Sequence, residues 1–205
     1  WHFINPDDPN DTALLEMIDG HIGNLVEALR TNNSERAAFE AAWMAHAITD
    51  GLTPAHHFPL EEAMAELRGG EGLETRTSIL KKNLMKGDNG IELIKNNWKF
   101  WGAKGMMTTH VAFEAGVASV VAYPRFKDAI PSDDETSQVK NHGYREYYLD
   151  QVHAVASMKM YDNFSKSGWT TDLAWQTNHE LMPIIIKSVM LGWLASIWKL
   201  EAEKK

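Results

Sequence analysis

Histidine and carboxylate side chains recur in this sequence at a spacing that suits metal binding. His46 and Asp50 are four residues apart, and so are His110 and Glu114. Residues four apart on an α-helix lie on one face, so each pair can direct an imidazole nitrogen and a carboxylate oxygen at one cation. His56 follows the first pair across a short turn, which could return its ring toward the preceding helix. Nitrogen and oxygen donors of this kind suit zinc.

Each pair also has a plainer interpretation. A His and a carboxylate four residues apart occur by chance and often form a solvent-exposed ion pair that contributes little to stability. For either pair alone, we favour that structural interpretation. The stretch 43–58 is otherwise apolar, however, and burying an imidazole and a carboxylate there without a partner would be costly. The two pairs together with the turn histidine therefore favour a metal site.

The composition narrows the chemistry of such a site. The chain has 205 residues and nine His but no Cys, which excludes thiolate zinc sites, iron–sulfur clusters, disulfides and Cys nucleophiles. Lys and Arg number 20 against 28 Asp and Glu, so the net charge is −8, and no basic stripe is evident. This balance speaks against a protein that coats nucleic acid but still permits a catalytic cleft for phosphates. Hydrophobic residues make up 44% of the chain, enough for a sizeable core.

Helical periodicity dominates the elements that must position these residues. Apolar residues repeat at three- and four-residue steps over about 12–31, and a second helix is expected from Ser34 to about Asp50, ended by Gly51 and Pro54. Further helices are expected at about 60–68, 77–86, 107–122, 144–165 and 179–201. Alternation at period two is almost absent. The predicted fold class is therefore all-α, a multi-helix bundle.

Three stretches are interpreted by composition. The segment 87–105 mixes turns with aromatic residues, and the segment from Pro124 to Asn141, rich in Asp, Ser and Pro, is the longest expected loop. The most apolar stretch, Pro183 to Trp198, is 16 residues long and contains a lysine. A membrane-spanning helix needs about 20 apolar residues. We therefore expect a buried C-terminal helix there.

Three runs along the chain carry a resemblance to a known family: His46-x-x-x-Asp50, Thr53-Pro54-x-His56 and His110-Val-Ala-Phe-Glu114. They resemble the zinc-dependent phospholipase C and P1/S1 nuclease superfamily, whose motif is His-x3-Asp-x5-His followed downstream by His-x3-Glu or His-x3-Asp. The segment that begins at His2 resembles the family's internal His-Phe-x-x-Pro-Asp segment, whose His binds metal. The resemblance covers about residues 1–122.

The resemblance implies one to three zinc ions in a cleft of an all-α domain that hydrolyses phosphodiester bonds. By matching position, the predicted metal ligands are His2, His46, Asp50, His56, His110 and Glu114. The first three would hold one zinc, Asp50 would bridge toward a second, and the last three would hold a third. Asp50 and Glu114 are the predicted catalytic carboxylates. Zinc lowers the pKa of a bound water toward neutrality and neutralises charge on phosphoryl oxygens, so no protein nucleophile is needed.

The chain is expected to form a single domain over 1–205 with a helical insertion. The gap from His56 to His110 is 54 residues, beyond the family's usual spacing, and an inserted helical pair at about 60–105 would explain it. Family members also carry a Trp, a His and an Asp upstream of the His-Phe segment. Trp1 directly precedes His2 and is interpreted as an internal aromatic residue. The family resemblance implies a secreted or periplasmic location.

A phospholipase C-like activity is the leading functional prediction, with a phospholipid head group as substrate. It is favoured because residue 114 is Glu rather than Asp, because the chain is acidic, and because an aromatic cluster precedes the second pair. That cluster, around Trp98 and Trp101, is expected to pack internally, with contact to a membrane surface as the alternative. The functional alternatives are a P1/S1-like single-strand nuclease, with nucleic acid as partner, and a non-catalytic metal-binding member.

Two further histidines receive structural predictions. His21 lies on the inward side of the first helix and is expected to be a hydrogen-bonded core residue. His57 is expected to face outward, as the neighbour of a ligand.

Overall fold

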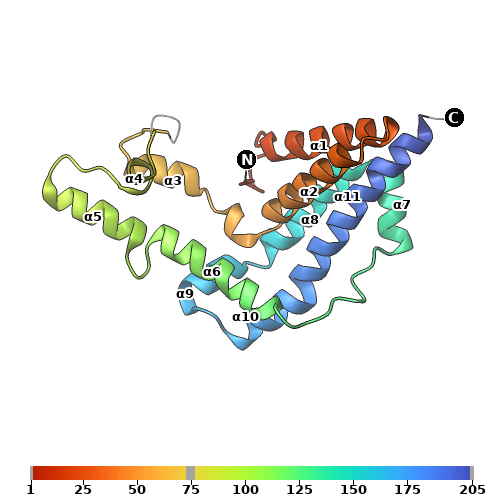
Figure 1. Cartoon of the computed structure of the whole chain (residues 1–205). Helices are drawn as coiled ribbons and strands as arrows, with labels where there is room; N and C mark the ends of the chain where they lie inside the picture. The colour runs from red at the N-terminus through yellow and green to blue at the C-terminus, as the bar shows by residue number, and fades with distance from the viewer. Residues whose placement is uncertain (1, 73–76, 204–205) are drawn as a thin grey trace.

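The computed structural model describes residues 2–72 and 77–203 and is built of helices and the turns between them (Figure 1). The elements in chain order are α1 (Ala13–Arg30), α2 (Ser34–Gly51), η1 (Pro54–His57), α3 (Leu60–Leu67), α4 (Ile79–Asn83), α5 (Gly90–Trp101), α6 (Met106–Val121), α7 (Asp133–His142), α8 (Tyr144–Ser157), α9 (Met160–Ser167), α10 (Thr171–Gln176), η3 (Thr177–Leu181) and α11 (Met182–Ala202). No strand occurs within these ranges, which confirms the predicted all-α class. Trp1 lies outside the described residues.

Helices α1, α2 and α11 pack against one another and form the body of the molecule together with α7 and α8 (Figure 1). A short turn joins α1 to α2, and Asn33 caps α2 because its side chain accepts a hydrogen bond from the Arg36 backbone N–H. Both helices match their predicted ranges within two residues. The periodic apolar residues of α1 face the core, as the spacing indicated.

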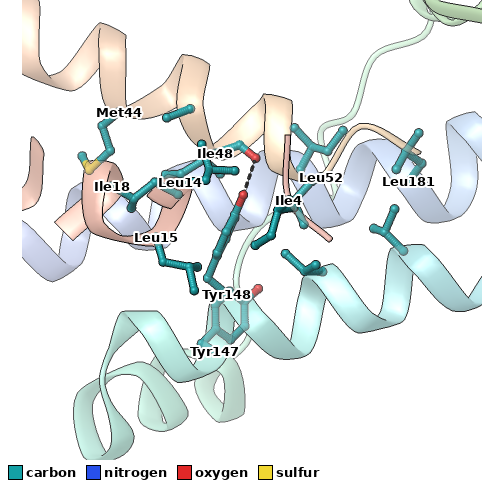
Figure 2. Close-up of a cluster of buried hydrophobic side chains, with 14 of the residues drawn as sticks. Ile4, Leu14, Leu15, Ile18, Met44, Ile48, Leu52, Tyr147, Tyr148 and Leu181 are labelled. Carbon is teal, nitrogen blue, oxygen red and sulfur yellow. Dashed lines mark hydrogen bonds between the residues drawn. The ribbon is translucent and has the colours of Figure 1, made fainter. Parts of the chain in front are cut away.

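The core of this body lies between α1, α2, α8 and α11, and Figure 2 shows its centre. Tyr148 extends from α8 to α2, where its hydroxyl donates a hydrogen bond to the Ile48 carbonyl at 3.1 Å. Gly51, in the last turn of α2, leaves room for this side chain. A Cβ at Gly51 would overlap the Tyr148 hydroxyl and the Leu14 side chain. The glycine therefore ends the helix and also permits α2 and α8 to approach.

The segment from α3 to α5 forms an arm at one end of the molecule (Figure 1). The structure describes residues 60–72 and 77–105 of this arm. The arm has a small apolar cluster of its own, separate from the main core, made of Leu60, Met64, Met85 and Phe100. Helix α6 connects the arm to the body (Figure 1). The arm corresponds to the predicted helical insertion at about 60–105, whose status as an insertion relative to other proteins stays a prediction.

Two segments expected to be irregular are helical, so those predictions were wrong. Helix α7 lies within the expected loop and begins at a capping box in which the Ser132 and Glu135 side chains each accept from the other residue's backbone N–H. Helix α5 lies within the segment expected to mix turns, and Asn89 caps it by accepting from Ile91 and Glu92 N–H groups. In both cases, the side chain at the helix start satisfies backbone donors that would otherwise lack partners.

Two other helices differ from their predicted extents. The helix expected over 144–165 is broken into α8 and α9 at Lys159, whose φ of 53° lies in the left-handed region. Helix α4 covers only Ile79–Asn83 of the helix expected at 77–86.

The C-terminal helix forms as predicted but is only partly buried. Ile185 and Leu191 lie in the core, whereas Trp193 and Ile197 are exposed. By length and composition alone, the continuous stretch Thr171–Ala202 could cross a membrane, and one third of its most apolar window is buried within the protein. Core helices of soluble proteins also meet that test.

Candidate metal centre

The first cluster of candidate ligands lies at the C-terminal end of α2 and consists of His2, His46 and Asp50; we call it the outer triad. His46 and Asp50 share one face of the helix, as their spacing requires, and His46 Nε2 lies 3.2 Å from Asp50 Oδ2. His2 reaches the same oxygen, with its Nδ1 2.5 Å from Asp50 Oδ2. The outer triad thus combines one helical pair with a residue far away in sequence.

The N-terminal segment carries His2 to this position because its next residues are fixed. Ile4 is buried, and its backbone N–H donates to the His56 carbonyl at 3.2 Å. The Phe3 ring packs on the His56 ring, with a centroid separation of 4.9 Å. These contacts attach the segment to η1, directly after α2.

The second cluster joins η1 to α6 and consists of His56, His110 and Glu114; we call it the inner triad. Glu114 Oε1 lies 3.1 Å from His56 Nε2 and 3.2 Å from His110 Nε2. The two imidazole rings are stacked, with centroids 5.2 Å apart and planes 3° from parallel. Both rings therefore direct Nε2 at the same carboxylate oxygen.

Asp50, a member of the outer triad, also contacts a histidine of the inner triad. Its Oδ2 contacts the outer histidines, while its Oδ1 lies 3.8 Å from His56 Nδ1. The Asp50 side chain is 13% exposed. One poorly hydrated carboxylate thus faces imidazole groups on two sides.

The inner triad is buried at its histidines and open at its carboxylate. The side chains of His56 and His110 are 8% and 9% exposed, but that of Glu114 is 44% exposed. Burial lowers the pKa of His110; the Glu114 carboxylate opposes this shift, and the neighbouring His56 adds to it. A lowered pKa favours the neutral imidazole, which is the form that binds a metal ion.

The donor atoms fit a zinc ion by chemistry and by spacing. Ligands of tetrahedral zinc at about 2.0–2.1 Å lie roughly 3.3 Å from one another. The two nitrogen–oxygen distances of the inner triad and the His46–Asp50 distance are 3.1–3.2 Å. The His2–Asp50 distance of 2.5 Å is shorter and is that of a hydrogen bond. Within each triad, one ligand atom from each residue lies within 4.8 Å of the others.

The inner histidines also have hydrogen-bonding capacity that the described part of the protein does not satisfy. The Nδ1 atoms of His56 and His110 are buried and have no hydrogen-bond partner within the residues that the structure describes. Buried polar groups normally have partners. Nδ1 is not the nitrogen that faces Glu114, so these two unpaired atoms are a feature separate from the candidate cation site at the Nε2 atoms.

All six predicted ligands lie in the two triads, and their role in binding zinc stays a prediction. The sequence reasoning did not assign Phe3 or Trp43 to the site. Phe3 covers the inner rings, and Trp43 packs edge-on against His46 with centroids 5.4 Å apart. Trp43 could have been predicted from the sequence, because it lies three residues before His46 and therefore on the same helical face.

The two other histidines give one confirmation and one correction. His21 Nδ1 lies 2.5 Å from the fully buried Glu40 carboxylate, so the predicted hydrogen-bonded core histidine is confirmed. His57 does not face outward as predicted: its Nε2 donates to the Gly51 carbonyl at 2.9 Å. Burial lowers its pKa, and the hydrogen bond to the Gly51 carbonyl opposes this shift. The one-turn η1 helix places His56 and His57 on different sides, but both are held by the fold.

Comparison of the chain with protein-family models, with curated proteins and with solved structures gave no match.

Proposed function

We propose that this protein is a zinc-dependent phosphodiester hydrolase of the phospholipase C type, as the sequence resemblance implies. The observation that carries the proposal is that Asp50 of the outer triad lies beside His56 of the inner triad, so that two groups of two histidines and one carboxylate are neighbours. Two neighbouring cation sites suit phosphate ester hydrolysis, where the attacking and leaving oxygens both need charge stabilisation.

In this proposal, different residues of the chain bind the cations, offset their charge and leave the site open to substrate. The outer triad would hold one cation and the inner triad another, and the Asp50 charge would offset both. Zinc, when bound, supplies Lewis acidity that makes water nucleophilic near neutral pH and neutralises phosphoryl oxygens. Phe3 covers the inner imidazoles on one side, and Glu114 is the exposed member of that triad. Substrate and water therefore approach from the Glu114 side, where this carboxylate can accept a proton.

A single-strand nuclease is the second candidate because a row of exposed side chains leads to the outer triad. Arg36 lies over the Phe39 ring at 5.2 Å, and the Phe39 and Trp43 ring centroids are 6.1 Å apart. Trp43 in turn contacts His46. Phe39 and Trp43 are about half exposed. Aromatic rings of this kind stack on unpaired bases, and the Arg36 guanidinium beside them is ion-paired with the Glu40 carboxylate.

The test combines metal analysis with hydrolysis of a small soluble phosphodiester. The parent protein should bind zinc and hydrolyse bis(p-nitrophenyl) phosphate. Asp50→Asn should lose more than one equivalent of zinc and all activity, because it removes a charge that offsets two dications. Asp128→Asn, an exposed carboxylate outside both triads, is the matched control and should keep both. Bound zinc without hydrolysis would identify a non-catalytic metal-binding protein, and absence of zinc binding would contradict the proposal.

The substrate class is decided by comparing phosphatidylcholine with single-stranded DNA. A phospholipase C-like enzyme hydrolyses the lipid, and Trp43→Ala leaves that rate nearly unchanged. A nuclease instead cleaves the DNA. Trp43→Ala should then weaken DNA binding by about tenfold, because the loss of one base stacked on an aromatic ring costs about that much affinity.

A further inference from the structure

Helix α5 of the arm carries its large apolar side chains on the outside of the molecule. Ile91, Ile94 and Trp98 are 82%, 71% and 70% exposed. Their spacing of three, four and seven residues places them on one face of the helix. Phe100 lies on the opposite side and is buried in the arm's small core. Phe100 therefore makes the contact with the arm's core, and the outward apolar face takes no part in it.

Apart from the buried Phe100, the inward side of α5 is held by the amides of Asn96 and Asn97, whereas an ordinary surface helix directs most of its apolar residues inward. Asn97 forms two hydrogen bonds with the Met85 backbone, accepting from its N–H and donating to its carbonyl, each at 3.0 Å. Asn96 donates to the Lys86 carbonyl at 2.6 Å. These amides attach the helix to the arm and leave its apolar face directed away from it. Such an inversion suits a helix whose apolar surroundings lie outside the protein.

The charge around this face is opposite to that of the whole chain. Residues 77–105 contain six Lys against two acidic residues, a net charge of +4 in a chain of net charge −8, whereas residues 60–72 of the arm contain four Glu and one Arg, so the positive charge is confined to the part that holds α4 and α5. Lys95 and Lys99 on α5 are exposed and border the apolar face, and Lys104 follows the helix. The protein therefore presents positive charge where it also presents apolar side chains.

We propose that α5 docks in the plane of a membrane that contains anionic lipid, through the face formed by Ile91, Ile94 and Trp98. At 12 residues, α5 is about 18 Å long and too short to span a bilayer. An exposed apolar face with a tryptophan, bordered by lysines, is the pattern of a helix that lies in the interface. The lysines select anionic head groups by charge complementarity.

Docking through α5 would also bring the metal centre close to the lipid surface. Helix α6, which carries His110 and Glu114, is separated from α5 by four residues and packs against it. This last step rests on the proposed function, since it gives a phospholipid substrate a route to the inner triad. The docking itself depends only on the arm.

Sedimentation of the full chain with vesicles tests the proposal. Binding to vesicles of phosphatidylcholine with phosphatidylglycerol should exceed binding to phosphatidylcholine alone by about tenfold and should weaken as salt is raised. The double variant Ile94→Ser/Trp98→Ser should lose about tenfold or more on both vesicles. Lys95→Glu/Lys99→Glu should lose only the preference for the anionic vesicles.

The control is Tyr123→Ser, which replaces a side chain that is 92% exposed outside the arm and should leave vesicle binding unchanged. Circular dichroism of each variant confirms that its helices are intact. Binding that is absent, or that the α5 variants leave unchanged, would overturn the proposal, and retention on single-stranded DNA or on another protein in place of vesicles would do the same. Soluble phosphodiester hydrolysis should be equal in all four proteins, so failure of docking is distinct from failure of the metal chemistry.

Discussion

The outer and inner triads have the same composition but different surroundings. Each has two histidines and one carboxylate, yet the outer histidines are 56% and 49% exposed and the inner ones 8% and 9%. The outer triad sits at the end of one helix and the start of the chain, whereas the inner rings are stacked beneath Phe3. Residue type therefore defines what each triad can bind, and burial decides how firmly its geometry is held.

The comparison is tested most strongly by removing one histidine from each triad. We expect His110→Ala to weaken zinc binding at its triad by about 100-fold, because it removes a ligand held in a water-poor setting. His46→Ala should cost less, since water can replace an exposed imidazole. Titration of zinc by calorimetry measures both, with His142→Ala as an exposed histidine control. Equal losses of zinc affinity in the two variants would show that burial does not make the two triads differ in zinc binding.

Metal removal should destabilise the protein, mainly through the inner triad. A ligand present at 100 times its Kd stabilises the folded state by about 2.7 kcal/mol, which is roughly 5–10 °C in Tm for a chain of this size. We expect EDTA to lower the Tm by that amount and zinc to restore it. The difference in Tm between the zinc and EDTA samples should decrease more in His110→Ala than in His46→Ala. An unchanged Tm in a sample with stoichiometric zinc would contradict this expectation.

Gly51→Ala should affect the two triads equally, in contrast with His110→Ala. A Cβ at this position would overlap the Tyr148 hydroxyl and Leu14, and such overpacking costs about 1–3 kcal/mol. The displaced turn carries Asp50, which both triads contact. Denaturant unfolding measures the stability, and zinc stoichiometry measures the triads. Ala47→Gly, which frees space in the same helix instead of filling it, is the comparison variant.

The smallest expected effect is a pH dependence that arises beside the inner triad. Because burial lowers the pKa of His57 below its ordinary value of 6.5, the unfolded chain binds more protons than the folded protein as the pH falls below that value. Stability should therefore decrease between about pH 7 and pH 5.5, and less so in His57→Gln. His142→Gln, at an exposed position, should follow the parent. Thermal unfolding across this range, with EDTA present throughout, measures the difference.

Most helices could be predicted because their signals are local. The apolar spacing of α1 and the cap and stop residues of α2 act within a few residues, so those helices appear where expected. The same locality places His46 with Asp50 and His110 with Glu114. The loop prediction over α7 was wrong although its capping box was present in the sequence, because a polar helix lacks the apolar stripe that marks helices.

Helix α5 was missed for a related reason, since Ile91, Ile94 and Trp98 face outward and Asn97 faces inward, the reverse of the usual pattern. Periodicity reports which residues share a face but not the direction in which that face points. The outward prediction for His57 was wrong because the ring turns back to the Gly51 carbonyl, a contact that depends on the path of η1.

The amino-acid sequence by itself determined the donor types, the absence of thiolates and the two helical pairs, because these depend on composition and on 3.6-residue geometry. Only the tertiary structure decided that the pairs lie beside each other, and that His110 is buried while His46 is exposed. His56 meets Glu114 across 58 residues of chain, and His2 meets Asp50 across 48. Such distant contacts form through packing of α6 and the N-terminal segment against η1, and no local pattern encodes packing between distant segments.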